Sequence, residues 1–396
     1  MLTTIQIILI VFMGLLVLSF IGNTLNLQRY GIYIIPVGII FRTKLFNKIL
    51  EKMGDKWKRF WKILYEVGKI LTGIIAVVLL GFFIVNPFLI LFKAPVSLGI
   101  QLIIPGVTID FKIALLFIFP ILVILIPHEI AHAVMARREG IEIKTSGIFL
   151  VLVFFGGFVE LAKESLEKAA EKSKIKVLLN GSAINAVFSI FFVALYFLTP
   201  VIISIGYGSA NGVLITNVYD NYPADEAGIK EGDVIVSIGK YNDSLGEIVY
   251  NSTLSIDDYA VIMQDNLEAK PFYIILLDES NITLTPTKVN PDSNTTSTSN
   301  IYLGVNIYNY YPPKASWESI WFPYYWDLQI TYTLNIALMA VFLNMLPLVM
   351  TDGDKILQIY LKKKITNELK YKRILNGIRV ISLLILVINI VLPIIL

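Results

Sequence analysis

Long apolar blocks are the feature that most limits what this 396-residue chain can fold into. A helix needs about 20 consecutive apolar residues to cross the hydrocarbon core of a bilayer. Six blocks come close to or exceed that length, at residues 3–21, 70–92, 113–136, 177–205, 328–350 and 376–396. Only 16 % of the residues are charged, whereas soluble domains have about 25 %. The sequence therefore predicts a polytopic α-helical membrane protein with about six transmembrane helices.

Charged residues between the blocks orient the predicted spans. Lys and Arg outnumber Asp and Glu in residues 22–69, 137–176 and 351–379. Residues 206–326 show the reverse, with five Lys, no Arg and fifteen Asp or Glu. Because cytoplasmic loops collect Lys and Arg, we expect the three basic stretches inside and both termini outside. Basic residues that flank apolar spans in this way do not indicate a nucleic-acid partner.

We expect four segments along the chain. An N-terminal membrane region covers residues 1–112, and residues 113–205 form the first half of a membrane core. Residues 206–312 lack apolar blocks and are expected to form an extracytoplasmic α/β domain. Residues 313–396 complete the membrane core and add the last span.

In the predicted aqueous domain, residues 212–218 and 232–239 have strand patterns, and residues 223–228 predict a short helix ended by glycine. This run resembles a PDZ domain of the bacterial and archaeal type. PDZ domains bind extended peptides or C-termini. The candidate peptide-binding residues are Gly212, Val213, Leu214 and Ile215. A domain that filters substrates by size, or a purely structural insertion, is the alternative interpretation.

A shorter apolar segment, residues 148–159, is rich in strand-forming residues but too short to span a bilayer. Backbone in this conformation is tolerated at membrane depth only where protein or water satisfies its polar groups. We therefore expect a re-entrant β segment at these residues.

The most specific chemical motif is H-E-x-x-H at residues 128–132, on a predicted helix. His128 and His132 are the only histidines in the chain, which also has no cysteine. Histidines four residues apart share one helix face and can bind one zinc ion, with Glu129 beside a metal-bound water. Such residues are costly within an apolar span unless they have a role. A histidine pair that only hydrogen-bonds within the bundle, or that serves metal or proton transport, is the alternative.

A catalytic zinc site needs three protein ligands and one open position. Without cysteine or a third histidine, the third ligand must be a carboxylate. The third and fifth predicted spans end on the same side of the membrane, close to His132 and Asp352 respectively. Pro347 interrupts the fifth span and Gly353 permits a sharp turn, so Asp352 can bend back toward the bundle. Asp354 is the competing ligand, and a turn without further function is the other interpretation.

Three motifs together resemble the site-2 protease family of intramembrane zinc metalloproteases. The matching residues are His128-Glu129-x-x-His132, Asn344-x-x-Pro347-x-x-x-x-Asp352-Gly353 and Asn180-Gly181-Ser182-Ala183-Ile184-Asn185. The last is similar to the family's G-P-x-x-N motif, with Ser182 where proline is usual. The resemblance covers the membrane core, at about residues 110–205 and 328–360, and extends to an inserted PDZ domain.

The resemblance implies one zinc ion per chain. Its ligands would be His128, His132 and Asp352. Glu129 would act as general base, taking a proton from water and passing it to the leaving amine. Asn185 and Asn344 are amides in apolar spans that could hold the substrate backbone or the developing oxyanion. Hydrogen bonding between helices is their alternative role.

The implied activity is hydrolysis of peptide bonds within or next to the transmembrane helices of membrane-protein substrates. We expect cleavage near the cytoplasmic face, in the plasma membrane of a prokaryote, with prior trimming of the ectodomain as one route. Residues 148–159 resemble the family's membrane-embedded β segment, which could pair with an unwound substrate. The alternative is a membrane metal or proton transporter, although a conduction path needs polar residues on several spans. A PDZ scaffold with an inactive core, or a zinc protease with a glutamate as third ligand, is a further alternative.

Overall fold

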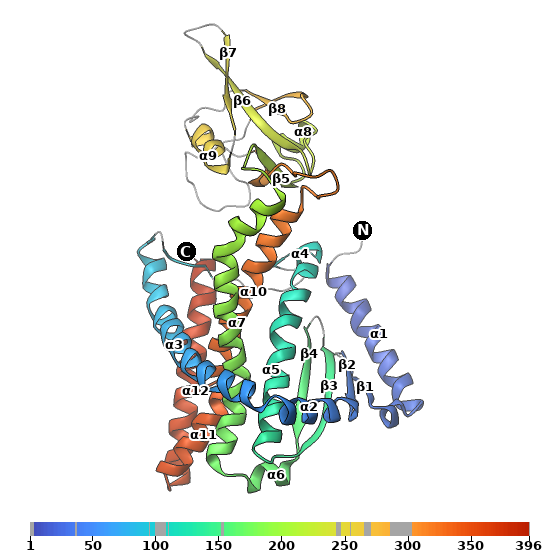
Figure 1. The fold of residues 1–396 in the computed structure, drawn as a ribbon, viewed down its shortest axis with the longest axis vertical. Coiled ribbons are helices and arrows are strands. Elements are labelled where there is room, and N and C mark those ends of the chain that lie inside the picture. Colours follow the sequence, from blue (N-terminus) through green and yellow to red (C-terminus); the bar gives the residue numbers. More distant parts are fainter. Residues whose placement is uncertain are drawn as a thin grey trace. The chain divides into compact units, whose positions relative to one another are not determined.

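Five helices of the chain are long and apolar enough to cross a bilayer (Figure 1). The computed structural model describes residues 4–35, 38–94, 96–99, 108–109, 111–151, 154–242, 247–253, 255–264, 271–285 and 303–395. Within them, the five helices are α3 (Lys58–Leu91), the stretch Ile113–Arg138 that ends in α5 (Ile118–Arg138), α7 (Glu171–Gly206), α10 (Phe322–Met345) and α12 (Glu368–Ile395). The chain is therefore an integral, multi-pass helical membrane protein. The block at residues 3–21 forms α1 (Thr4–Thr24), whose crossing of the membrane stays a prediction.

The chain divides into two compact units. The first contains Met1–Tyr196 and Gln329–Leu396, and the second contains Phe197–Leu328. The first unit holds all three sequence motifs. Its shorter helices are η1 (Leu27–Tyr30), α2 (Leu45–Lys56), α4 (Phe111–Leu116), α6 (Lys163–Lys168) and α11 (Asp352–Lys364).

A four-stranded antiparallel sheet belongs to the first unit. Its strands are β1 (Ile32–Ile35), β2 (Gly38–Thr43), β3 (Ile143–Val151) and β4 (Phe154–Leu161), in the order β1-β2-β3-β4. The hairpin expected around residues 148–159 is thus present as β3 and β4, and its depth in a membrane stays a prediction. The register of β2 on β3 pairs Phe41 with Ile148, so a segment far away in sequence widens the hairpin.

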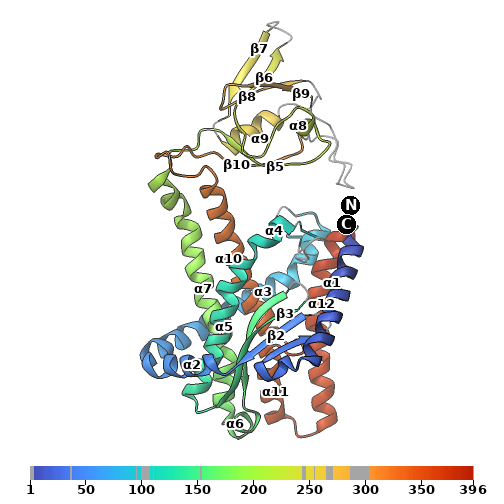
Figure 2. The ribbon, with the colours of Figure 1, turned by 90° about the vertical axis from the view of Figure 1, so that its right-hand side faces the viewer.

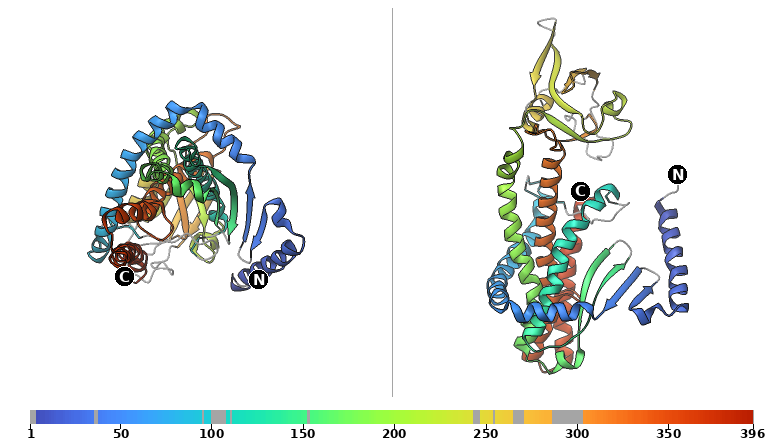
Figure 3. Two further views of the ribbon diagram at one scale, coloured as in Figure 1. Left: turned by 90° about the horizontal axis from the view of Figure 1, so that it is seen from below. Right: turned by 45° about the vertical axis from the view of Figure 1, so that its right-hand side comes forward.

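Close helix–strand contacts hold this sheet against the membrane helices. β4 packs on α5, and α1 lies beside β1 at the other edge of the sheet, as Figure 3 shows. A methyl group on Gly156 would lie against the end of the Leu125 side chain of α5, which would have to shift to make room for it. Asn47 of α2 donates to the Ile143 carbonyl of β3 at 3.1 Å, which ties α2 to the same sheet.

The second unit contains a six-stranded sheet with α8 and α9 beside it (Figure 2). The element bounds are β5 (Val213–Val218), α8 (Pro223–Glu226), β6 (Val234–Asn242), β7 (Glu247–Ser252), α9 (Ile256–Gln264), β8 (Phe272–Leu276), β9 (Asn281–Leu284) and β10 (Val305–Asn309). Their order is β10-β5-β6-β8-β9, with β7 paired to β6. Apolar side chains from β5, β6 and β8 form the buried core of this unit.

The position of β5 corrects one expectation for this unit. Val213 pairs with Asn309 of β10 on one side and with Ile235 of β6 on the other. Val213, Leu214 and Ile215 are almost completely buried, and Gly212 has a φ of 146° immediately before the strand. A peptide that adds to a sheet needs an unpaired strand edge. Residues 213–214 present none, because both of their edges are already occupied.

Polar side chains join α3 to α12 within the apolar part of the first unit. Asn86 donates to Asn389 Oδ1 at 2.9 Å, and Asn389 donates to the Phe83 carbonyl at 2.7 Å. Asn86 Oδ1 in turn accepts from the Leu98 backbone amide at 3.0 Å. Both amide side chains are fully buried. Hydrogen bonds of this kind between membrane helices replace contacts with water that the bilayer cannot supply.

We therefore predict that Asn389→Leu destabilises the protein by about 1–2 kcal/mol, because it removes these bonds and leaves one buried Asn86 N–H without its acceptor, while the other still donates to the Leu98 carbonyl. Thermal unfolding of the purified full chain in detergent measures the effect. Ile388→Leu, at an exposed neighbouring position of α12, is the matched control. Equal unfolding temperatures for Asn389→Leu and wild type would contradict the stabilising role of the hydrogen bonds between Asn86 and Asn389.

Candidate metal centre

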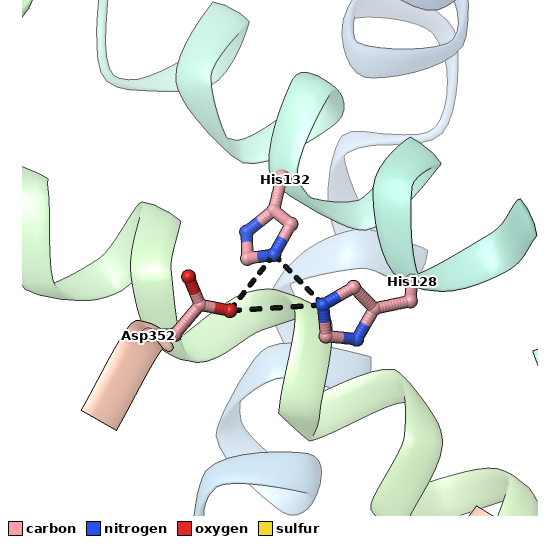
Figure 4. A group of neighbouring side chains, drawn as sticks. All are labelled: His128, His132 and Asp352. Atoms are coloured by element: carbon pink, nitrogen blue, oxygen red, sulfur yellow. Dashed lines mark hydrogen bonds and ion pairs between the residues drawn. The ribbon is translucent and has the colours of Figure 1, made fainter. Parts of the chain in front are cut away.

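Three side chains from two helices converge on one point in the first unit (Figure 4). α5 carries His128 and His132, and Asp352 is the first residue of α11. The two Nε2 atoms lie 3.0 Å apart, and Asp352 Oδ2 lies 3.1 Å from His132 Nε2 and 3.6 Å from His128 Nε2. His128 and Asp352 are almost completely buried. The structure thus brings together the three residues that the sequence indicated as ligands.

The spacing of these three atoms fits a tetrahedral ion. Metal–ligand bonds of about 2.0–2.2 Å place neighbouring ligands about 3.3–3.6 Å apart in a tetrahedron. The observed separations of 3.0, 3.1 and 3.6 Å lie close to that range. Two imidazoles and one carboxylate also leave a fourth position open. The three residues could therefore hold a metal ion with room for water or substrate.

Hydrogen bonds behind the imidazoles aim both Nε2 atoms at the common point. His132 Nδ1 donates to the Val177 carbonyl of α7 at 2.7 Å, which leaves Nε2 free to bind a metal. His128 Nδ1 lies 3.0 Å from the Asn185 side-chain amide. With the Asn185 oxygen turned to His128, Nδ1 donates to it, and this otherwise unpartnered buried oxygen is satisfied. Asn185 therefore orients His128.

Burial and hydrogen bonding act in opposite directions on the Asp352 carboxyl. With no ion bound, burial alone would raise its pKa, but hydrogen bonds donated by His128 and His132 outweigh this and hold the pKa well below its usual range. Lys355 Nζ lies 3.4 Å from the second oxygen, Oδ1. The carboxylate is consequently anionic, as a metal ligand must be.

Residues of the 180–185 motif bring α7 against the back of the histidine pair. Asn180 donates to the Ala131 carbonyl of α5 at 2.6 Å. A methyl group on Gly181 would collide with both imidazoles. Ser182, which stands where the resembled family has proline, is fully buried, and its hydroxyl has no hydrogen-bond partner among the described residues. The motif therefore acts through close packing as much as through its amides.

The turn that presents Asp352 differs from the expected one. α10 ends at Met345, and the chain reverses over residues 346–350, where Met350 has a φ of 82°. Thr351 caps α11 by accepting from the Asp354 amide at 3.2 Å. Gly353 lies inside α11, where a Cβ would collide with the Met345 carbonyl group. Gly353 thus serves a close backbone contact, and the sharp turn comes before it.

Asp354, the competing ligand, is engaged elsewhere. Arg379 of α12 binds it through two hydrogen bonds of 2.7 and 2.6 Å, and Gln358 donates to it at 2.8 Å. The Arg379 hydrogen bonds lower the pKa of the Asp354 carboxyl. This ion pair, buried on its Asp354 side and partly exposed at Arg379, fixes the first turn of α11 to α12. Arg379 was overlooked at the sequence level, although an arginine within the predicted span 376–396 signals a partner in the bundle.

The remaining candidates differ in their surroundings. Glu129 is partly exposed beside β4, where a Cβ on Gly157 would be 3.7 Å from Glu129 Cγ. Among the described residues, no hydrogen bond engages the Glu129 carboxylate. Asn344 is partly exposed one residue before the end of α10. It makes no hydrogen bond to the three converging side chains in the described part of the chain, so its role rests on the motif alone.

Comparison with known proteins adds an independent finding. Residues 116–388 match the model of Peptidase family M50. An uncharacterized protein of Methanocaldococcus jannaschii is 30 % identical over 246 residues, which cover 58 % of this chain and 59 % of that protein. A membrane-bound transcription factor site-2 protease homolog of Arabidopsis thaliana is 25 % identical over 199 residues, covering 49 % and 38 %. The matched segments thus span less than two thirds of either relative.

We predict that Gly181→Ala strongly lowers the metal content of the purified protein, because the added methyl displaces both imidazoles. Elemental analysis of the folded protein measures this loss. Gly73→Ala makes the same change in α3, where nothing lies within 4 Å of the added atom, and should retain the metal. Full metal content in Gly181→Ala would show that α7 does not restrain the histidines.

We also predict that Arg379→Gln destabilises the fold by on the order of 3 kcal/mol, because it leaves the buried Asp354 carboxylate unpaired. The metal content should fall as well, since Asp352 belongs to the same helical turn. Arg373→Gln, at an exposed position of α12, serves as the control for loss of a positive charge. Unfolding curves in detergent measure the free energy of unfolding. A decrease for Arg379→Gln no larger than that for Arg373→Gln would refute the prediction.

Proposed function

This chain belongs to Peptidase family M50, the site-2 protease family, and we propose that it is an intramembrane zinc endopeptidase. Its substrates are membrane proteins, cut within or next to a transmembrane helix. The observation that carries the proposal is the convergence of His128, His132 and Asp352 at spacings that suit a tetrahedral ion. An open fourth position is typical of catalytic zinc sites, whereas structural sites are closed.

Zinc, when held by these three residues, supplies a water of lowered pKa and a Lewis acid for the peptide carbonyl. Glu129 accepts the proton of the attacking water and then donates it to the leaving amine. Its carboxylate has no hydrogen-bond partner among the described residues, which supports this role. Asn185 orients His128, and Asn344 is proposed to hold the substrate backbone.

The four-stranded sheet suggests how the substrate backbone is held. Among the described strands, β4 is paired only with β3. An extended substrate strand is proposed to add along its other edge, on the side where β4 packs on α5. Gly157 of β4 lies next to Glu129, so a strand added there would pass the general base. Substrate helices that unwind easily, for example at Gly or Pro, are the expected targets because an extended backbone is needed.

The location of the reaction is proposed from the charge pattern of the sequence. Basic stretches flank the ends of α5 and α10 that carry the motifs, which favours an active site near the cytoplasmic face. We propose that the protein lies in the plasma membrane of a prokaryote and crosses it six times. The second unit is proposed to be PDZ-like and to lie on the outer side. That unit is proposed to limit access by size, because the strand expected to bind peptides is paired on both sides.

The test is cleavage of a model transmembrane substrate by the purified full chain in detergent, together with its zinc content. Wild type should cleave, and Glu129→Gln should retain zinc while losing about 10²–10⁴-fold in rate, as expected for a lost general base. Glu142→Gln, an exposed glutamate just beyond α5, is the matched control and should behave as wild type. Asp352→Ala should lose zinc and activity together.

Two outcomes would contradict the proposal. Absence of zinc from wild type would reject the metal centre. Zinc without cleavage, over several substrates with unstable helices, would favour a metal or proton transporter that uses the same ligands.

A further inference from the structure

A cavity of about 290 Å³ opens directly beside Glu129 in the first unit. Three elements enclose it: α2, α5 and the hairpin of β3 and β4. Among the described residues that line it, Glu129 is the only charged one, and most of the other side chains are apolar. Its volume is near the lower end of the roughly 300–1,000 Å³ of small-ligand pockets, so it suits a single large side chain.

One wall of the cavity comes from outside the residues that match the family. Ile49, Leu50 and Met53 of α2 line it, whereas the family match begins at residue 116. The opposite wall, from α5, belongs to the matched part. The cavity therefore combines a family element with one that precedes it in this chain.

Several contacts fix α2 in place as a wall. Asn47 donates to the Ile143 carbonyl and accepts from the Ser146 hydroxyl at 3.0 Å. The Trp61 indole donates to the Met53 carbonyl at 3.2 Å. Gly54 lies close to α5, where a Cβ would be 3.5 Å from the Val134 carbonyl oxygen. Because α2 is held near both of its ends, it cannot move aside freely, so the cavity can select among side chains by size.

We propose that this cavity binds a large apolar side chain of the substrate, on a residue that flanks the bond to be cut. The inference rests on the proposed function, since it takes Glu129 as the general base. Glu129 must reach the reacting peptide, and it also lines the cavity, so only a residue adjacent to that peptide can place its side chain there. Leu and Phe are the expected occupants, because charged or polar side chains would be desolvated without partners.

Ile49 controls the size of this subsite. Ile49 lines the cavity and is 56 % exposed overall, so a larger residue there can extend into the cavity without disturbing a packed core. Ile63 of α3 is 55 % exposed and does not line the cavity, which makes it a matched control. Ile49→Trp and Ile63→Trp are thus the same change at equal exposure.

The first experiment measures kcat/KM for a model transmembrane substrate with Ala, Leu or Phe on either side of the mapped cleavage point. At one of these positions, wild type should prefer Leu and Phe over Ala by about tenfold or more, the range expected for an apolar pocket. Ile49→Trp should abolish this preference while keeping the Ala substrate within about threefold of wild type. Ile63→Trp should keep the wild-type preference. An equal loss for all three substrates, or an unchanged preference, in Ile49→Trp would overturn the proposal.

A second experiment does not depend on turnover. The chain has no cysteine, so Ile49→Cys in the Glu129→Gln background provides a single thiol for oxidative cross-linking. A substrate with one cysteine moved along its span should cross-link at one position, and Ile63→Cys should show no such preference. If cross-linking is confined to one position but wild type cleaves no substrate, the proposed function is rejected, whereas binding of one substrate side chain in the cavity is supported. If wild type cleaves but cross-linking is spread along the span, as expected for a cavity filled by lipid, only the proposal that the cavity binds a substrate side chain is rejected. Neither cleavage nor position-specific cross-linking would reject both.

Discussion

Gly181 lets the α7 backbone approach α5 so closely that even a methyl group would collide with both imidazoles. The rest of the metal centre depends on this contact. At that distance, the Val177 carbonyl and the Asn185 amide reach the far nitrogens of His132 and His128. The imidazoles are thereby oriented before any ion binds, so little conformational entropy is lost when one does.

The carboxylate side of the centre is held by a different type of interaction. Asp352 belongs to a helical turn whose next acidic residue, Asp354, is bound by Arg379 through two hydrogen bonds. An ion pair with a buried carboxylate contributes little net stability, but any arrangement that takes Arg379 away leaves the Asp354 charge buried without its partner, which is strongly unfavourable. It therefore fixes one position of α11 relative to α12, and thus the position of Asp352.

Local patterns explain why much of the site could be predicted from the sequence. His128 and His132 share a helix face by spacing alone. The need for a carboxylate ligand, the matching ends of the third and fifth predicted spans and the family resemblance joined them to Asp352. Contacts between distant segments could not be predicted in this way. The pairing of β2 with β3 brings residues 38–43 beside residues 146–151, and the apolar stretch before residue 41 is too short to indicate its partner. From the sequence, Gly353 was interpreted as a turn residue. Its actual constraint is the close approach of the Met345 carbonyl, which depends on how two helices pack and leaves no local pattern in the sequence.

The order of the residues along the chain has a consequence for how the protein is made. His128 and His132 precede the whole second unit in the sequence, whereas Asp352 follows it. A chain emerging from the ribosome therefore carries two of the candidate ligands long before the third, and Arg379, which holds the helical turn of the third, comes later still. The side chains of the candidate centre can be positioned together only after α12 has been made.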